Sequence, residues 1–320
     1  DVPRNFPGKP FIVTESTSAL MTRGYYRMPS DSMYIWPTRW DVPFHDDSYS
    51  CSSYDNCHAP WGTTHEESWK LVKNNDFISG MYLWTGFDYL GEPTPYWWPA
   101  RSSYFGVIDL AGFPKDVYYM YQSEWTDKTV LHVFPHWNWQ KGETVDLWAY
   151  YSNADEVELF VNGVSQGVKR RNSQDYPAAG LRWNCVYQEG MNEIRAVGVK
   201  KKEKKEVSDV IRQEYQTAKW DKEAACQVSL LSEEGDTALV QVQLIDKNGI
   251  RCLSSKKQIT FEIAGDGSLI CNLGTSTGSR KVQAYNGRAL IRIKRNEGNS
   301  VVAVKSEGLP TAFLELKSPK

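Results

Sequence analysis

The stretch that decides how the first part of the chain folds is GKPFIVTE, residues 8–15. Its apolar run, residues 11–13, follows a proline and leads to a carboxylate, which predicts a buried strand that delivers Glu15 to an open sheet edge. A second run, residues 77–84, ends in Trp84. Parallel barrels carry their chemistry at the carboxyl ends of their strands. An acid and a tryptophan at adjacent strand ends therefore predict a site for a sugar.

The segment between the two predicted strands combines a long loop with one helix. Residues 16–62 are rich in Tyr, Trp, Pro, Asp and Ser, and loops of this length usually carry function. Thr64, with Glu67 three residues later, forms a capping-box pattern that predicts a helix ending near Asn75. A second helix is expected over residues 114–122. This order of elements predicts two β/α units at the start of the chain.

From about residue 130, short alternating strands replace the β/α pattern. The expected strands are 145–150, 157–161, 181–187, 193–199 and 207–215 in a first series, and 226–231, 238–245, 258–263, 288–293, 300–304 and 311–316 in a second. Asn162-Gly163 predicts a tight hairpin within the first series. The number and spacing of the strands predict two β-sandwiches. We therefore expect three domains, at residues 1–126, 127–218 and 219–320.

Composition excludes several classes of function. The chain has 320 residues and a net charge of −2, without a signature of nucleic-acid or membrane-surface binding. No window approaches the ~20 apolar residues of a membrane span. The six cysteines are too dispersed for a metal cluster, and a disulfide between Cys51 and Cys57 stays open. Aromatic residues make up 13% of the chain, which suits sugar stacking and large aromatic cores equally well.

Several stretches carry a family resemblance. They are WTGFDYLGEPTPY at 84–96, SYFGVIDLAGFPKD at 103–116, HVFPHWNW at 132–139, YDNC at 54–57 with PWG at 60–62, and ELFVNG at 158–163. Together they resemble glycoside hydrolase family 2, and more narrowly its β-galactosidase-like branch from Bacteroidetes. The resemblance implies the C-terminal part of a TIM barrel, its last two β/α units lying in residues 1–126, followed by two immunoglobulin-like β-sandwich domains.

The resemblance also implies a retaining glycosidase, which needs two carboxyl groups about 5–5.5 Å apart. Glu15 occupies the place of the nucleophile at the end of barrel strand seven, although an acid at a strand end is often merely exposed. The family's acid/base, a Glu after an Asn at the end of strand four, would lie upstream of Asp1. The Asn-Glu pairs at 192–193 and 296–297 do not follow barrel strands. The catalytic pair is thus expected to be incomplete in this chain.

Four further residues are candidates for binding substrate. The resemblance places Trp84 at the floor of the sugar subsite, and its alternative role is packing at the barrel mouth. Asp88 and Glu92 would either hydrogen-bond sugar hydroxyls or brace their loop. Trp36, like Trp40, would either wall the aglycone side of the site or pack within the long loop.

Terminal β-galactosides are the expected substrates. Family 2 β-glucuronidases carry an Asn-x-Lys triplet after strand eight that grips the uronate, and none occurs between Trp84 and Asp116, where Lys115 stands alone. Another family 2 specificity, β-glucuronidase or β-mannosidase, is one alternative, and a non-catalytic carbohydrate-binding or scaffold piece is another.

The remaining expectations concern partners and location. A glycoside or oligosaccharide is the expected ligand, with no cofactor and no metal. Two β/α units cannot close a barrel, so the N-terminal portion of the same enzyme is an expected partner, and the isolated chain is expected to be inactive. Relatives in Bacteroidetes are often exported, which by analogy favours a periplasmic or secreted location.

Overall fold

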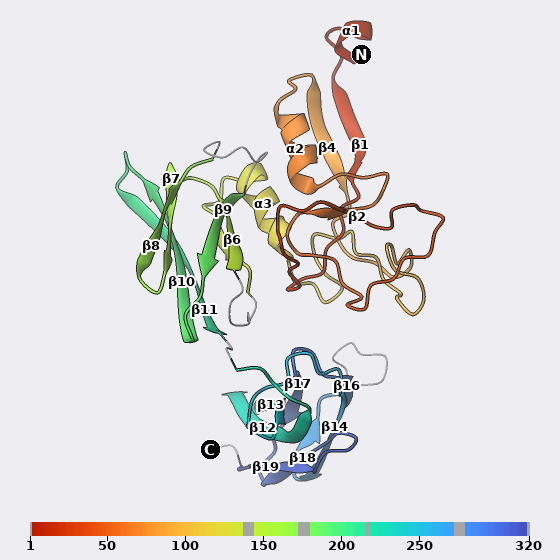
Figure 1. Cartoon of the computed structure of the whole chain (residues 1–320), viewed down its shortest axis with the longest axis vertical. Helices are drawn as coiled ribbons and strands as arrows, with labels where there is room; N and C mark the ends of the chain where they lie inside the picture. Colours follow the sequence, from red (N-terminus) through yellow and green to blue (C-terminus); the bar gives the residue numbers. More distant parts are fainter. Residues whose placement is uncertain (1, 137–143, 172–179, 216–217, 272–278, 319–320) are drawn as a thin grey trace. The chain divides into compact units, whose positions relative to one another are not determined.

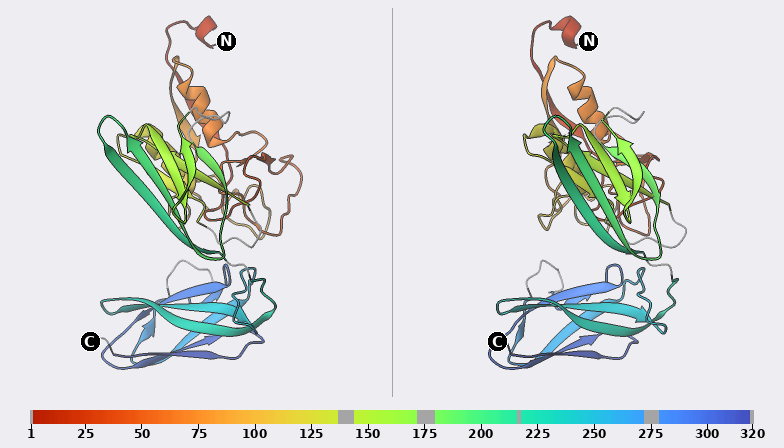
Figure 2. Two further views of the ribbon diagram at one scale, coloured as in Figure 1. Left: turned by 60° about the vertical axis from the view of Figure 1, so that its left-hand side comes forward. Right: turned by 90° about the vertical axis from the view of Figure 1, so that its left-hand side faces the viewer.

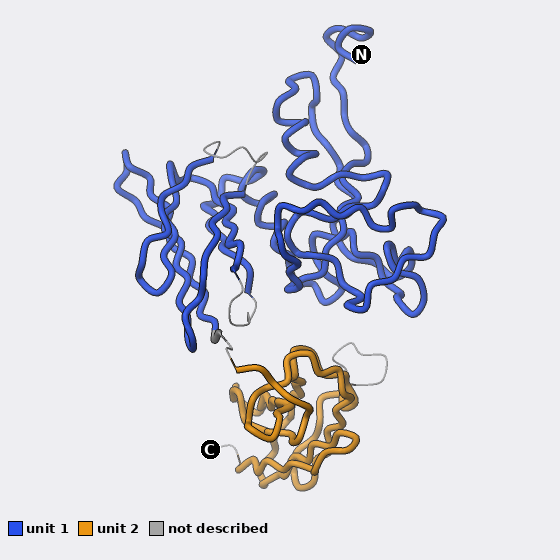
Figure 3. Tube along the Cα trace, viewed as in Figure 1, with its two compact units in different colours: residues 1–217 blue, residues 218–320 orange. Residues whose placement is uncertain are grey.

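The structure is a computed structural model that describes residues 2–136, 144–171, 180–215, 218–271 and 279–318. It divides into two compact units, residues 1–217 and residues 218–320 (Figure 3). No helix among the described residues is long and apolar enough to cross a membrane.

The first unit begins with two parallel strands joined through a helix. Strand β1 (Phe11–Thr17) pairs with β4 (Ile78–Trp84), and helix α2 (His65–Lys73) lies against them (Figure 1). Thr64 caps α2 by accepting a hydrogen bond from the Glu67 amide at 3.2 Å, which confirms the predicted helix start. Helix α3 (Asp116–Trp125) follows the loop after β4. The order expected for two β/α units is therefore present.

Short elements that the sequence did not predict complete this region. They are helix α1 (Val2–Asn5) and the two-residue strands β2 (Tyr34–Ile35) and β3 (Cys57–His58), which pair with each other in the long loop after β1.

Strands β1 and β4 pair only with each other among the described residues, so these residues contain no closed barrel. The expectation that residues 11–13 form a buried strand is wrong for Phe11 and Ile12, which are 37% and 52% exposed. The strand itself forms as predicted. Phe11 and Ile12 stay in solvent although α2 lies against the sheet, because among the described residues β1 has β4 as its neighbour along one edge and no strand along the other.

The first β-sandwich follows α3. One sheet has the order β5-β6-β9 and the other the order β11-β10-β7-β8, with every neighbouring pair antiparallel. The strands are β5 (Leu131–Phe134), β6 (Thr144–Tyr151), β7 (Glu156–Val161), β8 (Val164–Lys169), β9 (Leu181–Val186), β10 (Gly190–Lys200) and β11 (Lys205–Tyr215). Asn162 and Gly163 have φ of 52° and 78°, as the predicted tight hairpin requires. The long β10–β11 hairpin is the green pair of strands in Figure 2.

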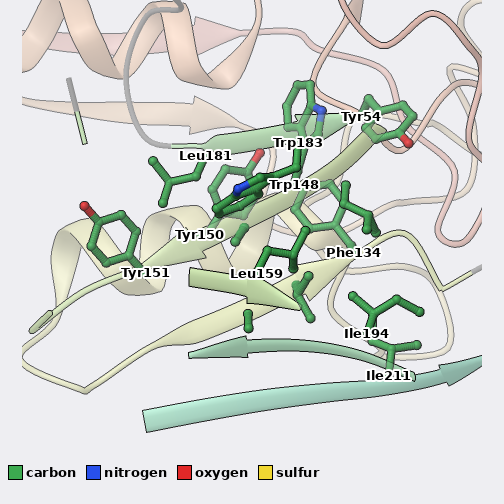
Figure 4. Close-up of a cluster of buried hydrophobic side chains, with 14 of the residues drawn as sticks. Tyr54, Phe134, Trp148, Tyr150, Tyr151, Leu159, Leu181, Trp183, Ile194 and Ile211 are labelled. Atoms are coloured by element: carbon green, nitrogen blue, oxygen red, sulfur yellow. The ribbon is translucent and has the colours of Figure 1, made fainter. Parts of the chain in front are cut away.

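One aromatic core runs across the predicted boundary at residue 126. The Tyr54 ring, from the loop after β1, lies 5.1 Å from the Trp148 ring of β6, centroid to centroid (Figure 4). The Tyr54 hydroxyl also donates to the Asp146 carbonyl at 2.6 Å. Met120 of α3 belongs to the same cluster of buried side chains. The β/α segment and the first sandwich are thus packed as one unit, and the boundary between them stays a prediction.

A buried charged cluster crosses the same junction. Asp55 accepts the backbone amides of His65 and Glu66 at 3.0 and 2.7 Å, at the start of α2. Glu66 in turn pairs with Arg182 of β9 at 2.7 Å, and the Arg182 guanidinium lies 3.7 Å from the centroid of the Trp148 ring. Burial raises the pKa of Asp55 to about 6 and that of Glu66 to about 7, against the opposing effect of Arg182. The junction therefore contains carboxyl groups that titrate near neutral pH.

The second unit is another all-antiparallel β-sandwich. Its sheets have the orders β12-β13-β17-β15 and β16-β14-β18-β19. The strands are β12 (Glu223–Glu234), β13 (Thr237–Asp246), β14 (Gln258–Gly265), β15 (Ser268–Leu269), β16 (Lys281–Gln283), β17 (Arg288–Lys294), β18 (Ser300–Lys305) and β19 (Ala312–Leu316). Apolar side chains from both sheets, among them Val240, Phe261 and Ile291, form one core, which fits the alternation in the sequence.

The charge at the junction predicts a pH-dependent stability, and a Glu66→Gln variant would lack the part of it that Glu66 contributes. The pKa of Glu66 is higher in the folded than in the unfolded chain, so its stabilising contribution is complete below about pH 4 and is lost as the pH rises through about 7. Between about pH 5 and about pH 8 we expect the melting temperature of the wild type to fall relative to that of Glu66→Gln, measured by circular dichroism. Glu193→Gln, at the exposed pair with Arg212, is the control. A constant difference between wild type and Glu66→Gln would contradict this prediction.

Candidate active site

Glu15 and Trp84 lie at the same end of the parallel strand pair. The backbone pairing matches Thr17 with Trp84, and Glu15 stands two residues before that match. The Thr17 hydroxyl donates to the Trp84 carbonyl at 3.0 Å, which holds the two strand ends together. The Glu15 side chain is exposed. None of the hydrogen bonds or ion pairs among the described residues involves its carboxylate. The carboxylate is therefore open to a ligand, as a nucleophile must be.

A local irregularity in β1 contains Glu15. Val13 pairs with Met81 and Ser16 with Leu83, so three steps along β1 match two steps along β4. An extra residue in one strand bends that strand and re-aims its side chains, and such bulges are frequent beside active sites. The alternation of side chains along β1 thus changes at the position of the candidate nucleophile.

The indole of Trp84 is oriented by a chain of polar groups. Its Nε1 donates to the Tyr89 hydroxyl at 3.1 Å, and that hydroxyl donates to the Glu92 carboxylate. Burial raises the pKa of Tyr89 to about 12, with the neighbouring Glu92 acting in the same direction, so the hydroxyl stays protonated as a donor. Trp84 is 38% exposed, which leaves part of its ring free. Glu92 contacts Tyr89, the bracing role considered from the sequence, and its role toward a sugar stays a prediction.

Asp88 forms a buried ion pair with Lys115. The Lys115 ammonium, 1% exposed, lies 2.9 Å from the Asp88 carboxylate, which also accepts the Gly106 amide at 2.8 Å. The same ammonium donates to the Met21 carbonyl at 2.8 Å, so it ties the loop after β4 to the loop after β1. Burial raises the pKa of Asp88 and lowers that of Lys115, and each charge opposes the shift of the other. In the structure Asp88 therefore stabilises its own loop, and a role of Asp88 in binding sugar stays a prediction.

Trp36 lies among other side chains of the long loop. Its ring centroid is 4.8 Å from that of Phe44 and 5.4 Å from that of Tyr34, and the Arg27 guanidinium lies 5.0 Å from it. These contacts are the packing role considered from the sequence, and a wall beside the aglycone stays a prediction. Sequence reasoning missed Trp61, Trp97 and Trp98, which the structure leaves exposed. Their dense clustering with prolines was the available signal.

Neither of the two Asn-Glu pairs lies at the ends of β1 and β4. Of the two Asn-Glu pairs, Asn192-Glu193 lies on β10 of the sandwich, and Asn296-Glu297 lies between β17 and β18. No group of three or more His, Cys, Asp or Glu side chains within the described ranges could hold a metal ion. Cys51 and Cys57 are both buried free thiols here.

Comparisons with known proteins assign the class. Residues 224–315 match the family model described as "Glycoside hydrolase family 2 C-terminal domain 5", and residues 142–207 match one described as "Domain of unknown function (DUF4982)". The chain thus carries a C-terminal domain of glycoside hydrolases. It is 51% identical to "Beta-galactosidase BoGH2A" of Bacteroides ovatus, over 99% of this chain and 38% of that protein. The chain therefore belongs to glycoside hydrolase family 2.

Solved structures support the same assignment. A Parabacteroides merdae β-glucuronidase with glycerol in its active site is 61% identical, with a TM-score of 0.70, over 97% of this chain and 38% of that one. Bacteroides uniformis β-glucuronidase 3 is 34% identical, with a TM-score of 0.66, over 96% of this chain and 39% of that one. The chain thus spans less than two fifths of the length of these relatives. One of them is named a β-galactosidase, and the two solved structures are titled β-glucuronidases.

The Asp88–Lys115 pair predicts a large cost when one partner is removed. Lys115→Met leaves the Asp88 carboxylate buried without its counter-charge, and we expect the free energy of unfolding of the first unit to fall by about 3–5 kcal/mol. Urea unfolding followed by circular dichroism measures the change. Adding Asp88→Asn to Lys115→Met should recover part of the loss. The control is Arg23→Ala, which breaks the Arg23–Asp109 pair at the surface of the same two loops and should cost about 1 kcal/mol or less. Equal losses in both single variants would contradict the prediction.

Proposed function

We propose that this chain is the C-terminal part of a retaining β-glycosidase in which Glu15 is the nucleophile and Trp84 the floor of the sugar subsite. The observation that carries the proposal is the position of an open carboxylate and a half-exposed indole at one end of a parallel strand pair, in a chain of a glycosidase family. Glu15 would attack the anomeric carbon and form a glycosyl ester. A second carboxyl group would protonate the leaving oxygen and then activate the water that hydrolyses the ester.

The proposal includes a complete TIM barrel in which β1 and β4 are the seventh and eighth strands. A parallel sheet is normally covered on both faces, and its unpaired edges need neighbours. The exposed apolar side chains Phe11, Ile12 and Tyr82 of this pair support the presence of such neighbours in the whole enzyme. The acid/base carboxyl would come from that other portion of the barrel. The two sandwiches would be its immunoglobulin-like C-terminal domains.

Terminal β-galactosides are the substrates that we propose. Recognition of a uronate by a lysine requires a free ammonium, and Lys115 is buried and bonded to Asp88. The relative at 51% identity, named a β-galactosidase, supports the same choice.

β-Glucuronidase is the second candidate. Two solved structures with that title are 61% and 60% identical to this chain. Arg101, an exposed cation in the loop after β4, would be the group available for a uronate.

Replacing the nucleophile tests the mechanism. In the full-length enzyme, Glu15→Gln should lower kcat on an aryl β-galactoside on the order of 10⁴-fold or more, because no glycosyl ester can form. A 2-deoxy-2-fluoro-galactosyl fluoride should label the wild type on the peptide that contains Glu15, detected by mass spectrometry. Glu193→Gln on the sandwich surface is the control and should retain wild-type kcat. A label on another carboxylate would assign the nucleophile elsewhere.

A comparison of substrates tests the specificity. The full-length enzyme should hydrolyse an aryl β-galactoside with a kcat/KM at least about 100-fold above that for the matching β-glucuronide, because no lysine in the loop after β4 is free to bind the uronate. The reverse ratio would select the second candidate, and Arg101→Ala should then reduce turnover of the glucuronide alone.

A further inference from the structure

A tryptophan-lined groove lies on the two loops that leave the candidate site. It has a volume of about 340 Å³ and is lined from the loop after β1 and from the tip of the loop after β4. Four indoles contribute to it and remain open to solvent: Trp40 at 75%, Trp61 at 52%, Trp97 at 53% and Trp98 at 76% exposed. Scattered surface aromatics need no explanation, whereas several gathered in one concavity mark a binding site.

Ordered contacts hold the groove in shape. The loop after β4 doubles back on itself, with Leu90 bridging Ser102 and the Gly91 amide donating to the Arg101 carbonyl at 2.8 Å. At its tip, Tyr96 is 1% exposed and donates to the Ser50 carbonyl at 2.8 Å, which anchors the tip on the loop after β1. The exposed indoles therefore stand on a packed base. Because the loops are already held in place, binding a ligand would cost little additional conformational entropy.

The chemistry of the lining selects the ligand. Apart from the four indoles and Tyr96, the groove is lined by prolines and Thr94, so no charged side chain lines it. The Arg101 guanidinium lies outside the lining, 4.7 Å from the centroid of the Trp98 ring. Flat aromatic faces complement the apolar C–H faces of pyranose rings, and a neutral wall suits a neutral, hydroxyl-rich chain better than a charged one. The lining comes from the loops that follow the strand ends of Glu15 and Trp84, which connects the groove with the place where a sugar would be cleaved.

We infer that this groove is a second saccharide site, which binds neutral β-linked oligosaccharides through rings beyond the one that is cleaved. The inference rests on the proposed glycosidase function and extends it from single glycosides to glycan chains. The groove would provide an aromatic wall for the rest of the glycan, separate from Trp36, which packs among neighbouring rings. Binding at this site would raise the affinity for a long substrate without touching the reacting bond.

The experiment separates binding at the groove from hydrolysis. In the full-length enzyme carrying Glu15→Gln, titration calorimetry with β-1,4-galactotetraose should give an affinity that falls at least about tenfold when Trp97→Ala and Trp98→Ala are added. In enzyme with Glu15 intact, the two tryptophan substitutions should lower kcat/KM for the tetrasaccharide by a similar factor. They should leave kcat and KM for the aryl β-galactoside unchanged.

The control is Phe313→Ala, an aromatic truncation at a 67% exposed position of the second unit, which should alter neither affinity nor turnover. Unchanged tetrasaccharide affinity in the double tryptophan variant would overturn the inference. If the affinity were unchanged and the molecular mass of the variant in solution differed from that of the wild type, the groove would be a contact between protein chains. An enzyme that binds the tetrasaccharide through the groove and hydrolyses no glycoside would refute the proposed function and leave the saccharide site standing.

Discussion

The parallel pairing of β1 with β4 is the interaction on which the candidate site depends. Parallel strands end at the same edge, so the pairing brings residues more than sixty positions apart in sequence to one end of the sheet. The bond from the Thr17 hydroxyl to the Trp84 carbonyl fixes the last step of the alignment. A shift by one residue would turn the alternate side chains to the opposite face, and Glu15 would no longer stand on the side that its bulge selects.

Two strands alone do not stabilise such an alignment, and the rest of the first unit supplies what they lack. Helix α2 contacts the strand pair, and its first turn is tied to the sandwich through Glu66 and Arg182. The loop after β1 sends Tyr54 into the core of the sandwich, against Trp148. The first sandwich is therefore more than a spacer, because it completes the core under the loops that carry the site. An isolated β/α segment would lose both the Tyr54–Trp148 ring contact and the Glu66–Arg182 ion pair.

Local patterns predicted the elements well. The capping box at Thr64, the hairpin at Asn162-Gly163 and the alternation of the two strand series all lie where the sequence placed them, because each depends on neighbours within a few residues. Short strands such as β15 and β16 escaped prediction, since two or three residues carry no periodicity. The exposure of Phe11 and Ile12 could not be predicted either, because apolar runs indicate burial without saying which neighbours provide it.

Side-chain roles in the site were harder to predict than its location. Asp88, Glu92 and Trp36 have the residue types of a sugar site, and all three contact other parts of their own loops. Lys115 is the one lysine of the loop after β4. The fold buries it against Asp88, so its ammonium is not available to bind a substrate. Burial thus decides which groups of suitable chemistry can meet a ligand. The groove on the loops that follow Glu15 and Trp84 is lined by four indoles and by no charged side chain, so discrimination among longer glycans there would depend more on stacking faces than on fixed charges.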